Sequence, residues 1–446
     1  MQPLAYDKAL QTPMLSARRV PRTLQAPVAD AAIAPRLQAA IDSSPTSSCL
    51  LVQVGDRVLN PSANAATALI PASNQKLLTT YAALRLLGPD FRFRTLVLAD
   101  GAPLNGVVNG NLYLVGDGDP FLTTEDWWSQ YEDVEGRYHT RLEDLVDRIV
   151  KAGITQVTGS LIGDESLFDS VRQGPWAERL LMSKQSGPLS ALTLNEGFVD
   201  WPPRFTDGTR LRSETDNPPL HVASALAQLL QASGVTITGT GSGTTPDSAL
   251  QVADIQSPPL IDTVTHINSH SSNLGAELLL KRLGVLRLGE GSTRAGAQVV
   301  TSVLVADGIP TEGLRIDDGS GLAETDRVSC QTLASVLAKA GPDSDFATSL
   351  AIGATRGSLR ERFVDSPAAT RVLAKTGTLN NALALSGYVH SATDPAIVVT
   401  FSFLANDDLI SADANRTIQD ALVVALTGYP GIPSAAELSP IAPVSR

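Results

Sequence analysis

Three short motifs that lie far apart in this chain place the strongest constraint on its fold. They are Ser73-Asn-Gln-Lys76, Ser271-Ser-Asn273 and Lys375-Thr-Gly-Thr378, and the first and third begin 302 positions apart (375 minus 73). Together they contain a hydroxyl nucleophile, an amine base, a proton relay and a strand that can bind a carboxylate, which are the parts of an acyl-transfer site. A fold that uses them must bring three distant stretches of backbone to one place.

The first motif opens an apolar helix that Gly88 and Pro89 end. Positions three apart share a helix face, so Ser73 and Lys76 present their hydroxyl and amine side by side. A lysine accepts a proton only when it is neutral, so its pKa must fall from about 10.4 to about 7 or 8, a change of roughly 4 kcal/mol. Burial, the positive end of the helix and the second cation, Lys375, are expected to lower it, and no acidic residue adjoins the motif.

The second motif has two interpretations. Ser271 and Asn273 precede a predicted long helix, where serine and asparagine commonly cap backbone groups. Beside Lys76, however, Ser271 would relay a proton between the amine and the leaving group, while Asn273 would hold the lysine and the substrate amide. The same S-x-N pattern also occurs at Ser62, so this motif alone is not specific.

The third motif is predicted to be an edge strand that faces a cleft. Gly377 would let a substrate backbone approach closely, and the hydroxyls of Thr376 and Thr378 would receive a terminal carboxylate with help from the charge of Lys375. The backbone N–H groups of Ser73 and Thr378 would form the oxyanion hole.

Length and composition set the broad class of the protein. A chain of 446 residues predicts two or three modules, and its net charge of -12 argues against a nucleic-acid partner, which needs a basic patch. No stretch of eighteen apolar residues predicts a membrane span, and residues 1–23 lack the apolar core of a signal peptide, so either a targeting segment lies upstream or the protein is cytosolic. Cys49 and Cys330 are compatible with one long-range disulfide or with two separate buried thiols.

The hydrophobic pattern predicts a mixed α/β fold of the α+β type, with an antiparallel sheet flanked by helices and an inserted domain. We expect residues 1–89 and 254–446 to form the main domain and residues 90–253 the insert, because short strands and turns begin near Phe91. Residues 25–40 have helical spacing, but Pro27 and Pro35 are expected to confine any helix to short pieces. Further predictions are a strand, turn and strand over 49–60, helices over 273–288 and 412–426, and neighbouring strands over 375–379, 384–389 and 396–403.

With these motifs in place, the chain resembles the low-molecular-mass class C penicillin-binding proteins, the D-alanyl-D-alanine carboxypeptidases and endopeptidases of peptidase family S13. Further matching segments lie at 114–120, 159–168, 317–322, 357–362, 374–378 and 385–388. The resemblance implies a penicillin-binding domain like that of the serine β-lactamases. It also implies that Ser73 is acylated, that Lys76 is the general base, and that Ser271 and Asn273 are the relay. Lys375, Thr376 and Thr378 would form the side of the site that binds the carboxylate and the oxyanion.

The same resemblance implies a substrate, inhibitors and a location. The substrate would be a peptidoglycan stem peptide, β-lactam antibiotics would be covalent inhibitors, and the protein would act outside the cytoplasm, in the periplasm or cell envelope. No cofactor and no metal would be needed. Asp164 and Phe168 match positions that can face the cleft from the insert, although an aspartate that satisfies a turn and a phenylalanine in the core explain them equally well.

Two departures from the family pattern and two rival functions stay open. Only 198 positions (271 minus 73) separate the first two motifs, so a smaller second insert is expected to be missing or reduced near 201–219. Ala323 and Glu324 stand where the family commonly has Ser-Arg, which exchanges a cation at the cleft edge for an anion. A β-lactamase and a catalytically silent cell-wall-binding protein are the alternatives to a peptidase.

Overall fold

The computed structural model describes residues 21–129, 138–200, 213–407 and 411–431. Its main domain is built on an antiparallel sheet with the strand order β15-β16-β17-β18-β1-β2. The strands are β1 (Ser47–Val54), β2 (Arg57–Val58), β15 (Ala351–Ile352), β16 (Val372–Leu379), β17 (Ala382–His390) and β18 (Val398–Asn406). The first and last thirds of the chain therefore meet in one sheet, since β1 pairs with β18.

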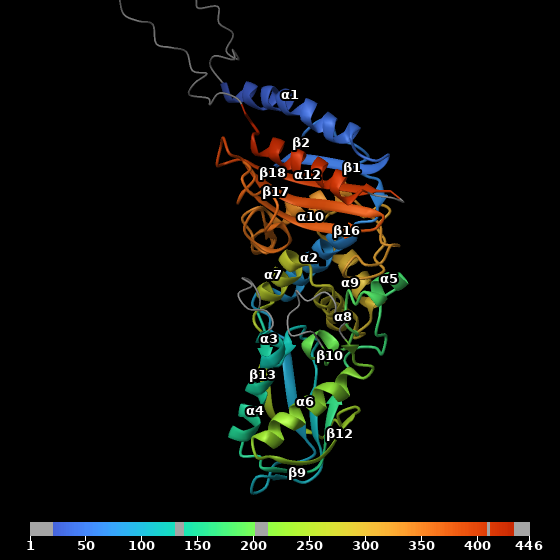
Figure 1. Cartoon of the computed structure of the whole chain (residues 1–446), viewed down its shortest axis with the longest axis vertical. Helices are drawn as coiled ribbons and strands as arrows, with labels where there is room; N and C mark the ends of the chain where they lie inside the picture. The colour runs from blue at the N-terminus through green and yellow to red at the C-terminus, as the bar shows by residue number, and fades with distance from the viewer. Residues whose placement is uncertain (1–20, 130–137, 201–212, 408–410, 432–446) are drawn as a thin grey trace, which may run out of the picture.

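Helices cover both faces of this sheet, as Figure 1 shows. Along β1, Leu50 and Val52 pack into the core under α1 (Pro21–Asp42) and α12 (Ala412–Thr427), whereas Cys49 and Leu51 pack on the opposite side. That opposite core contains the helices α2 (Gln75–Leu87), α7 (Leu260–His270), α8 (Asn273–Leu288), α9 (Thr293–Ala306), α10 (Cys330–Ala340) and α11 (Asp345–Thr348). The alternation of buried faces is the period of two expected for a strand with a core on each side.

The expectation of short helical pieces near Pro27 and Pro35 is wrong. Helix α1 runs without a break through both prolines. Ala29, Ile33 and Leu37 recur four positions apart and are buried against the sheet and α12. The burial of this stripe offsets the hydrogen bonds that the prolines remove. The other named helices and strands agree with prediction, and the predicted helix over 273–288 coincides with α8.

A second domain lies at the far end of the molecule in Figure 1. Its sheet has the order β12-β9-β6-β4-β13, and β5 also pairs with β9. These strands are β4 (Arg94–Ala99), β5 (Val107–Val108), β6 (Leu112–Val115), β9 (Gln156–Asp164), β12 (Thr236–Ser242) and β13 (Leu250–Gln256). Helices α4 (Leu142–Lys151) and α6 (Pro218–Ala232) pack on it around a separate hydrophobic core. The chain enters through β4 and leaves through the adjacent β13, so residue 253, where we expected the insert to end, lies inside a strand.

The remaining short elements lie outside these two large sheets and the helices that cover them. They are β3 (Ala68–Leu69), β7 (Leu122–Thr123), β8 (Thr140–Arg141), β10 (Phe198–Asp200), β11 (Ser213–Glu214), β14 (Val328–Ser329), α3 (Glu125–Trp128), α5 (Glu178–Met182), and the 3-10 turns η1 (Ala72–Asn74), η3 (Asn195–Gly197) and η4 (Gly357–Leu359). Most of the region where we expected a reduced second insert, 201–212, lies outside the described residues. None of the described helices has the length and hydrophobicity needed to cross a membrane.

Cys49 and Cys330 form a disulfide, which decides between the two possibilities left by the sequence. It joins β1 to the first residue of α10, with the two Cα atoms 6.0 Å apart and 281 positions between them. Replacing both cysteines by alanine is expected to lower the free energy of unfolding by roughly 5 kcal/mol, because so long a closed loop restricts the unfolded chain. Urea unfolding of the oxidised protein and the double variant checks this, and two free thiols in the untreated protein would contradict it.

Candidate active site

The side chains of Ser73 and Lys76, the predicted nucleophile and base, lie together. Ser73 lies in η1 and Lys76 in the first turn of α2, and Lys76 Nζ lies 3.0 Å from Ser73 Oγ. The Lys76 side chain is fully buried. It also donates to Asn273 Oδ1 at 2.7 Å and to the carbonyl of Ser320 at 2.6 Å.

The capping interpretation of the second motif applies to its middle residue alone. Ser272 caps α8 by accepting the N–H of Gly275 at 3.2 Å, whereas Ser271 ends α7 in the left-handed conformation with φ of 63°. The side chains of Ser271 and Asn273 therefore make other contacts. Asn273 Oδ1 accepts from Lys76, and Asn273 Nδ2 donates to the carbonyl of Gln185 at 2.7 Å, so the two ends of the amide are distinguished.

The third motif lies on β16, next to the other two. Lys375 Nζ donates to Ser271 Oγ at 2.9 Å and to its neighbouring carbonyl, Thr376 O, at 3.0 Å. Thr376 Oγ1 donates to Ser358 Oγ at 2.8 Å. Within the described residues β15 pairs with β16 at Leu373 and Ala374, so β16 from Lys375 onward is paired on one side, by β17. This is the edge strand that the sequence predicted.

Gly377 has a role that the sequence analysis did not anticipate. A Cβ atom at this position would lie 2.9 Å from the carbonyl of Pro71 and 3.0 Å from the backbone nitrogen of Ser73. The missing side chain therefore lets β16 pack against the turn that carries the nucleophile. This contact brings the third motif to the first and leaves the approach of a substrate to Gly377 as a prediction.

No acidic residue adjoins the first motif in the sequence, but buried acids from distant segments oppose the pKa shift of Lys76. Burial lowers the pKa of Lys76 to about 8, although Asp318, Glu277 and Asp326 each act to raise it. Burial, together with the charge of Lys76, also holds the pKa of Lys375 well below its usual range. At Lys76 desolvation outweighs the three carboxyl groups because the amine is fully removed from water.

The loop over 317–323 supplies one of these acids, Asp318, and the carbonyl of Ser320 that holds Lys76. Asp318 accepts the backbone N–H groups of Ser320, Gly321 and Ala323. Glu277, which is fully buried on α8, accepts those of Gly319 and Ser320, and burial raises its pKa to about 8. The loop carries a segment used for the family resemblance, but nothing in its sequence indicated that a main-chain carbonyl would face Lys76.

Asp164 and Phe168 do not contact these motif residues in the described structure. Asp164, at the end of β9, is 2% exposed and accepts the backbone N–H groups of Ser166 at 2.8 Å and Thr245 at 2.7 Å. These bonds outweigh burial and lower its pKa. Phe168 is buried and packs against Gly118. Both have the contacts of a turn and a core, and a role toward substrate stays a prediction for each.

Glu324, which replaces the arginine expected from the family, is neutralised by the insert. It forms an ion pair with Arg179 of α5. The anion at this edge is therefore not left without a partner. Among the residues that the structure describes, no group of three histidine, cysteine, aspartate or glutamate side chains has an arrangement that could hold a metal ion.

Comparison with known proteins identifies the family. The model of the D-Ala-D-Ala carboxypeptidase 3 (S13) family matches residues 50–202 and 202–429. A D-alanyl-D-alanine carboxypeptidase of Actinomadura is 29% identical over 81% of this chain and 78% of its own length, and a carboxypeptidase of Mycobacterium tuberculosis is 31% identical over 80% and 75%. The fold is similar to the crystal structure of penicillin-binding protein 4 from Haemophilus influenzae, with a TM-score of 0.71, 22% identity, and coverage of 87% of this chain and 98% of that one. The chain therefore belongs to the D-Ala-D-Ala carboxypeptidase 3 (S13) family of penicillin-binding peptidases.

Proposed function

We propose that this member of the family hydrolyses the bond after a D-alanine of a peptidoglycan stem peptide, with Ser73 as nucleophile and Lys76 as general base. The observation that carries these roles is the set of contacts around Lys76 Nζ. Asn273 Oδ1 and the Ser320 carbonyl are acceptors, so each takes one N–H of the amine. When the amine is neutral, its lone pair is then left to accept the hydroxyl proton of Ser73, 3.0 Å away.

Acylation follows from this arrangement. The oxygen of Ser73 attacks the carbonyl carbon of the substrate while its proton passes to Lys76, and the N–H groups of Ser73 and Thr378 stabilise the oxyanion. Loss of one such donor typically costs about 2.7 to 4 kcal/mol. Ser271 gives its proton to the nitrogen of the departing D-alanine and regains one from Lys76, while Lys375 donates a hydrogen bond to Ser271 Oγ. Water then hydrolyses the ester on Ser73.

The free edge of β16 supports the mode of substrate binding. A substrate can pair with this edge as an extended strand, as peptides commonly do on unpaired sheet edges. Its terminal carboxylate would lie against the hydroxyls of Thr376 and Thr378, near Lys375. Recognition of that carboxylate favours a carboxypeptidase, and cleavage of a cross-linked peptide in addition would extend the activity to that of an endopeptidase.

β-Lactam antibiotics are proposed to acylate the same serine. Penicillin-binding protein 4 of Haemophilus influenzae, which has the same fold, has a solved structure with a β-lactam. In this chain Glu277 is fully buried, and both of its oxygens accept backbone N–H groups. We therefore expect a long-lived acyl-enzyme with a β-lactam, whereas a β-lactamase would release the hydrolysed antibiotic rapidly.

An extracytoplasmic location is part of the proposal. The substrate lies outside the cytoplasm, and the disulfide between Cys49 and Cys330 is typical of proteins in oxidising compartments. The β-lactam adduct and its lifetime test the function. After incubation with benzylpenicillin, mass mapping is expected to find one penicilloyl group on Ser73 that persists for many minutes. Adduct on another residue would contradict the nucleophile assignment, and release within seconds would support the β-lactamase.

A further inference from the structure

A residue outside the three motifs, Gln185, contacts the side-chain amide of Asn273 and orients it. Its oxygen accepts from Lys76 Nζ and its nitrogen donates to the carbonyl of Gln185, both at 2.7 Å. If the amide turned over, its oxygen would face the carbonyl of Gln185, which is also an acceptor, and its NH2 group would face the N–H of Lys76, which is also a donor. The carbonyl of Gln185 therefore selects the orientation in which Asn273 can hold the base.

Gln185 lies on a closed loop, residues 172–189, that contains α5. Helix α5 ends at Met182 with Ser183 as its C-cap, and the chain turns at Lys184, whose φ is 54°. The N–H of Gln185 then donates to the carbonyl of Leu180 at 3.2 Å. The direction of the Gln185 carbonyl is thus set by the end of α5.

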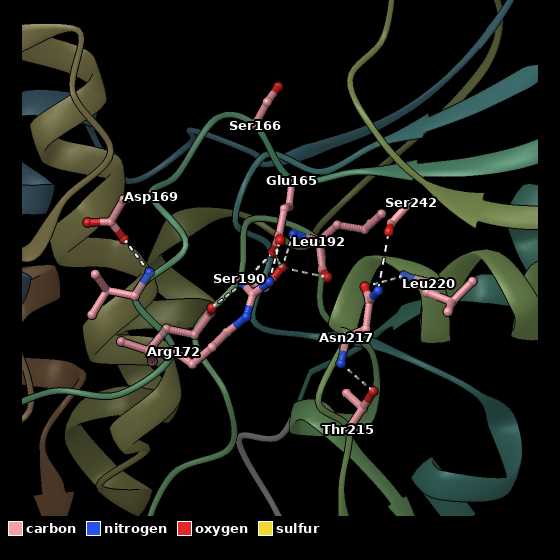
Figure 2. Close-up of polar contacts among 12 residues, drawn as sticks. Glu165, Ser166, Asp169, Arg172, Ser190, Leu192, Thr215, Asn217, Leu220 and Ser242 are labelled. Atoms are coloured by element: carbon pink, nitrogen blue, oxygen red, sulfur yellow. Dashed lines mark hydrogen bonds and ion pairs between the residues drawn. The ribbon is translucent and has the colours of Figure 1, made fainter.

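A polar cluster, shown in Figure 2, holds together the two ends of this loop, Arg172 and Leu189, which we call its neck. Leu189 N–H donates to the Arg172 carbonyl at 2.8 Å, and Arg172 Nη1 donates back to the Leu189 carbonyl at 3.0 Å. The same guanidinium forms a two-pronged ion pair with Glu165, and Ser190 Oγ donates to Glu165 at 2.5 Å. Bidentate arginine–carboxylate pairs of this kind stabilise a contact and also fix its geometry.

The body of the loop is anchored on the main domain. Arg179 pairs with Glu324, and the indole N–H of Trp176 donates to Asp318 Oδ2 at 2.9 Å. The loop is therefore tied at its neck by Arg172 and along its length to the segment that also presents the Ser320 carbonyl to Lys76.

We propose that residues 172–189 are a positioning loop whose Gln185 carbonyl keeps the Asn273 amide turned toward Lys76. This inference rests on the proposed roles of Lys76 and Asn273. If it is correct, the full acylation rate depends on a part of the chain that contains none of the three motifs. Loosening the loop should slow acylation without weakening the first, non-covalent binding of the β-lactam.

A double-mutant cycle tests this, with the acylation rate constant of Ser73 by a fluorescent penicillin as the readout. The loop variants are Arg172→Gln, which opens the neck, and Arg179→Gln, which breaks the partly exposed pair with Glu324. Each is made in the parent protein and in the Asn273→Ala variant. Arg294→Gln, which breaks the more exposed ion pair between Arg294 of α9 and the preceding Glu290, is the matched control.

Each loop variant is expected to slow acylation about tenfold in the parent, as loss of one hydrogen bond to the site does. In the Asn273→Ala background the same changes should lower the acylation rate constant less than twofold. The control Arg294→Gln should leave the rate constant unchanged in either background. Equal losses in both backgrounds, or no loss in the parent, would overturn the positioning loop. If Asn273→Ala alone leaves acylation unchanged, the proposed function fails instead. Should Arg172→Gln not fold, Arg179→Gln completes the cycle.

Discussion

Replacing Ser73 by alanine is expected to remove D-alanine release and covalent penicillin labelling together. In serine hydrolases, loss of the nucleophile lowers turnover on the order of 10⁶-fold, because the acyl-enzyme can no longer form. The side chain removed is small, and Lys76 keeps its bonds to Asn273 and Ser320. The fold should therefore persist. The measurements are release of D-alanine from a synthetic stem peptide and labelling by a fluorescent penicillin.

A matched control separates the loss of the nucleophile from a general effect of serine removal. Ser62→Ala makes the same change in the S-x-N sequence that lies outside the site, at an exposed position. This variant should label and turn over like the parent. Labelling of Ser73→Ala at the parent rate would mean that another residue is acylated.

Replacing Lys76 by methionine is expected to lower the acylation rate roughly 10⁴-fold, the upper end of what a general base contributes. Methionine approximates the length of the lysine side chain in a fully buried site but cannot accept the Ser73 proton. Stopped-flow labelling measures the rate. Lys339→Met, an exposed lysine on α10, is the matched control and should react like the parent.

The pH dependence of acylation reports on the same base. The pKa of Lys76 is lowered to about 8, chiefly by burial and against the opposing charges of Asp318, Glu277 and Asp326. Because the neutral amine is the reactive form, the rate should rise about tenfold for each pH unit below 8 and level off above it. A rate that keeps rising toward pH 10 would mean that Lys76 retains an ordinary pKa. Lys76→Met should lose this dependence.

Much of the fold was predictable because its signals are local. The apolar run after Ser73, the pattern over 273–288 and the alternation along β16 to β18 each depend on neighbouring residues, and each prediction is confirmed. The predicted break in α1 is wrong because the continuity of this helix depends on residues that are distant in the sequence. Burial of Ala29, Ile33 and Leu37 depends on α12, almost 400 positions away, and a local proline rule takes no account of it.

In the candidate active site, too, local features could be predicted from the sequence and contacts between distant segments could not. Its chemical groups could be named from the three motifs, including the choice of Ser73 as nucleophile and Lys76 as base. The acids beside Lys76 could not, because Glu277 and Asp318 are distant in sequence and reach the amine through the packing of α8 and the loop over 317–323. The family comparison supports the reaction class and says nothing of these contacts.

By itself, the order of residues determined which side chains we predict to do the chemistry, since spacing on one helix face or one strand depends on backbone periodicity alone. Tertiary structure alone decided how those side chains are held. Lys76 is held by the carbonyl of Ser320, and Asn273 by that of Gln185. A main-chain carbonyl is the same at every position and leaves no mark in the sequence, so its direction emerges only when distant segments pack together.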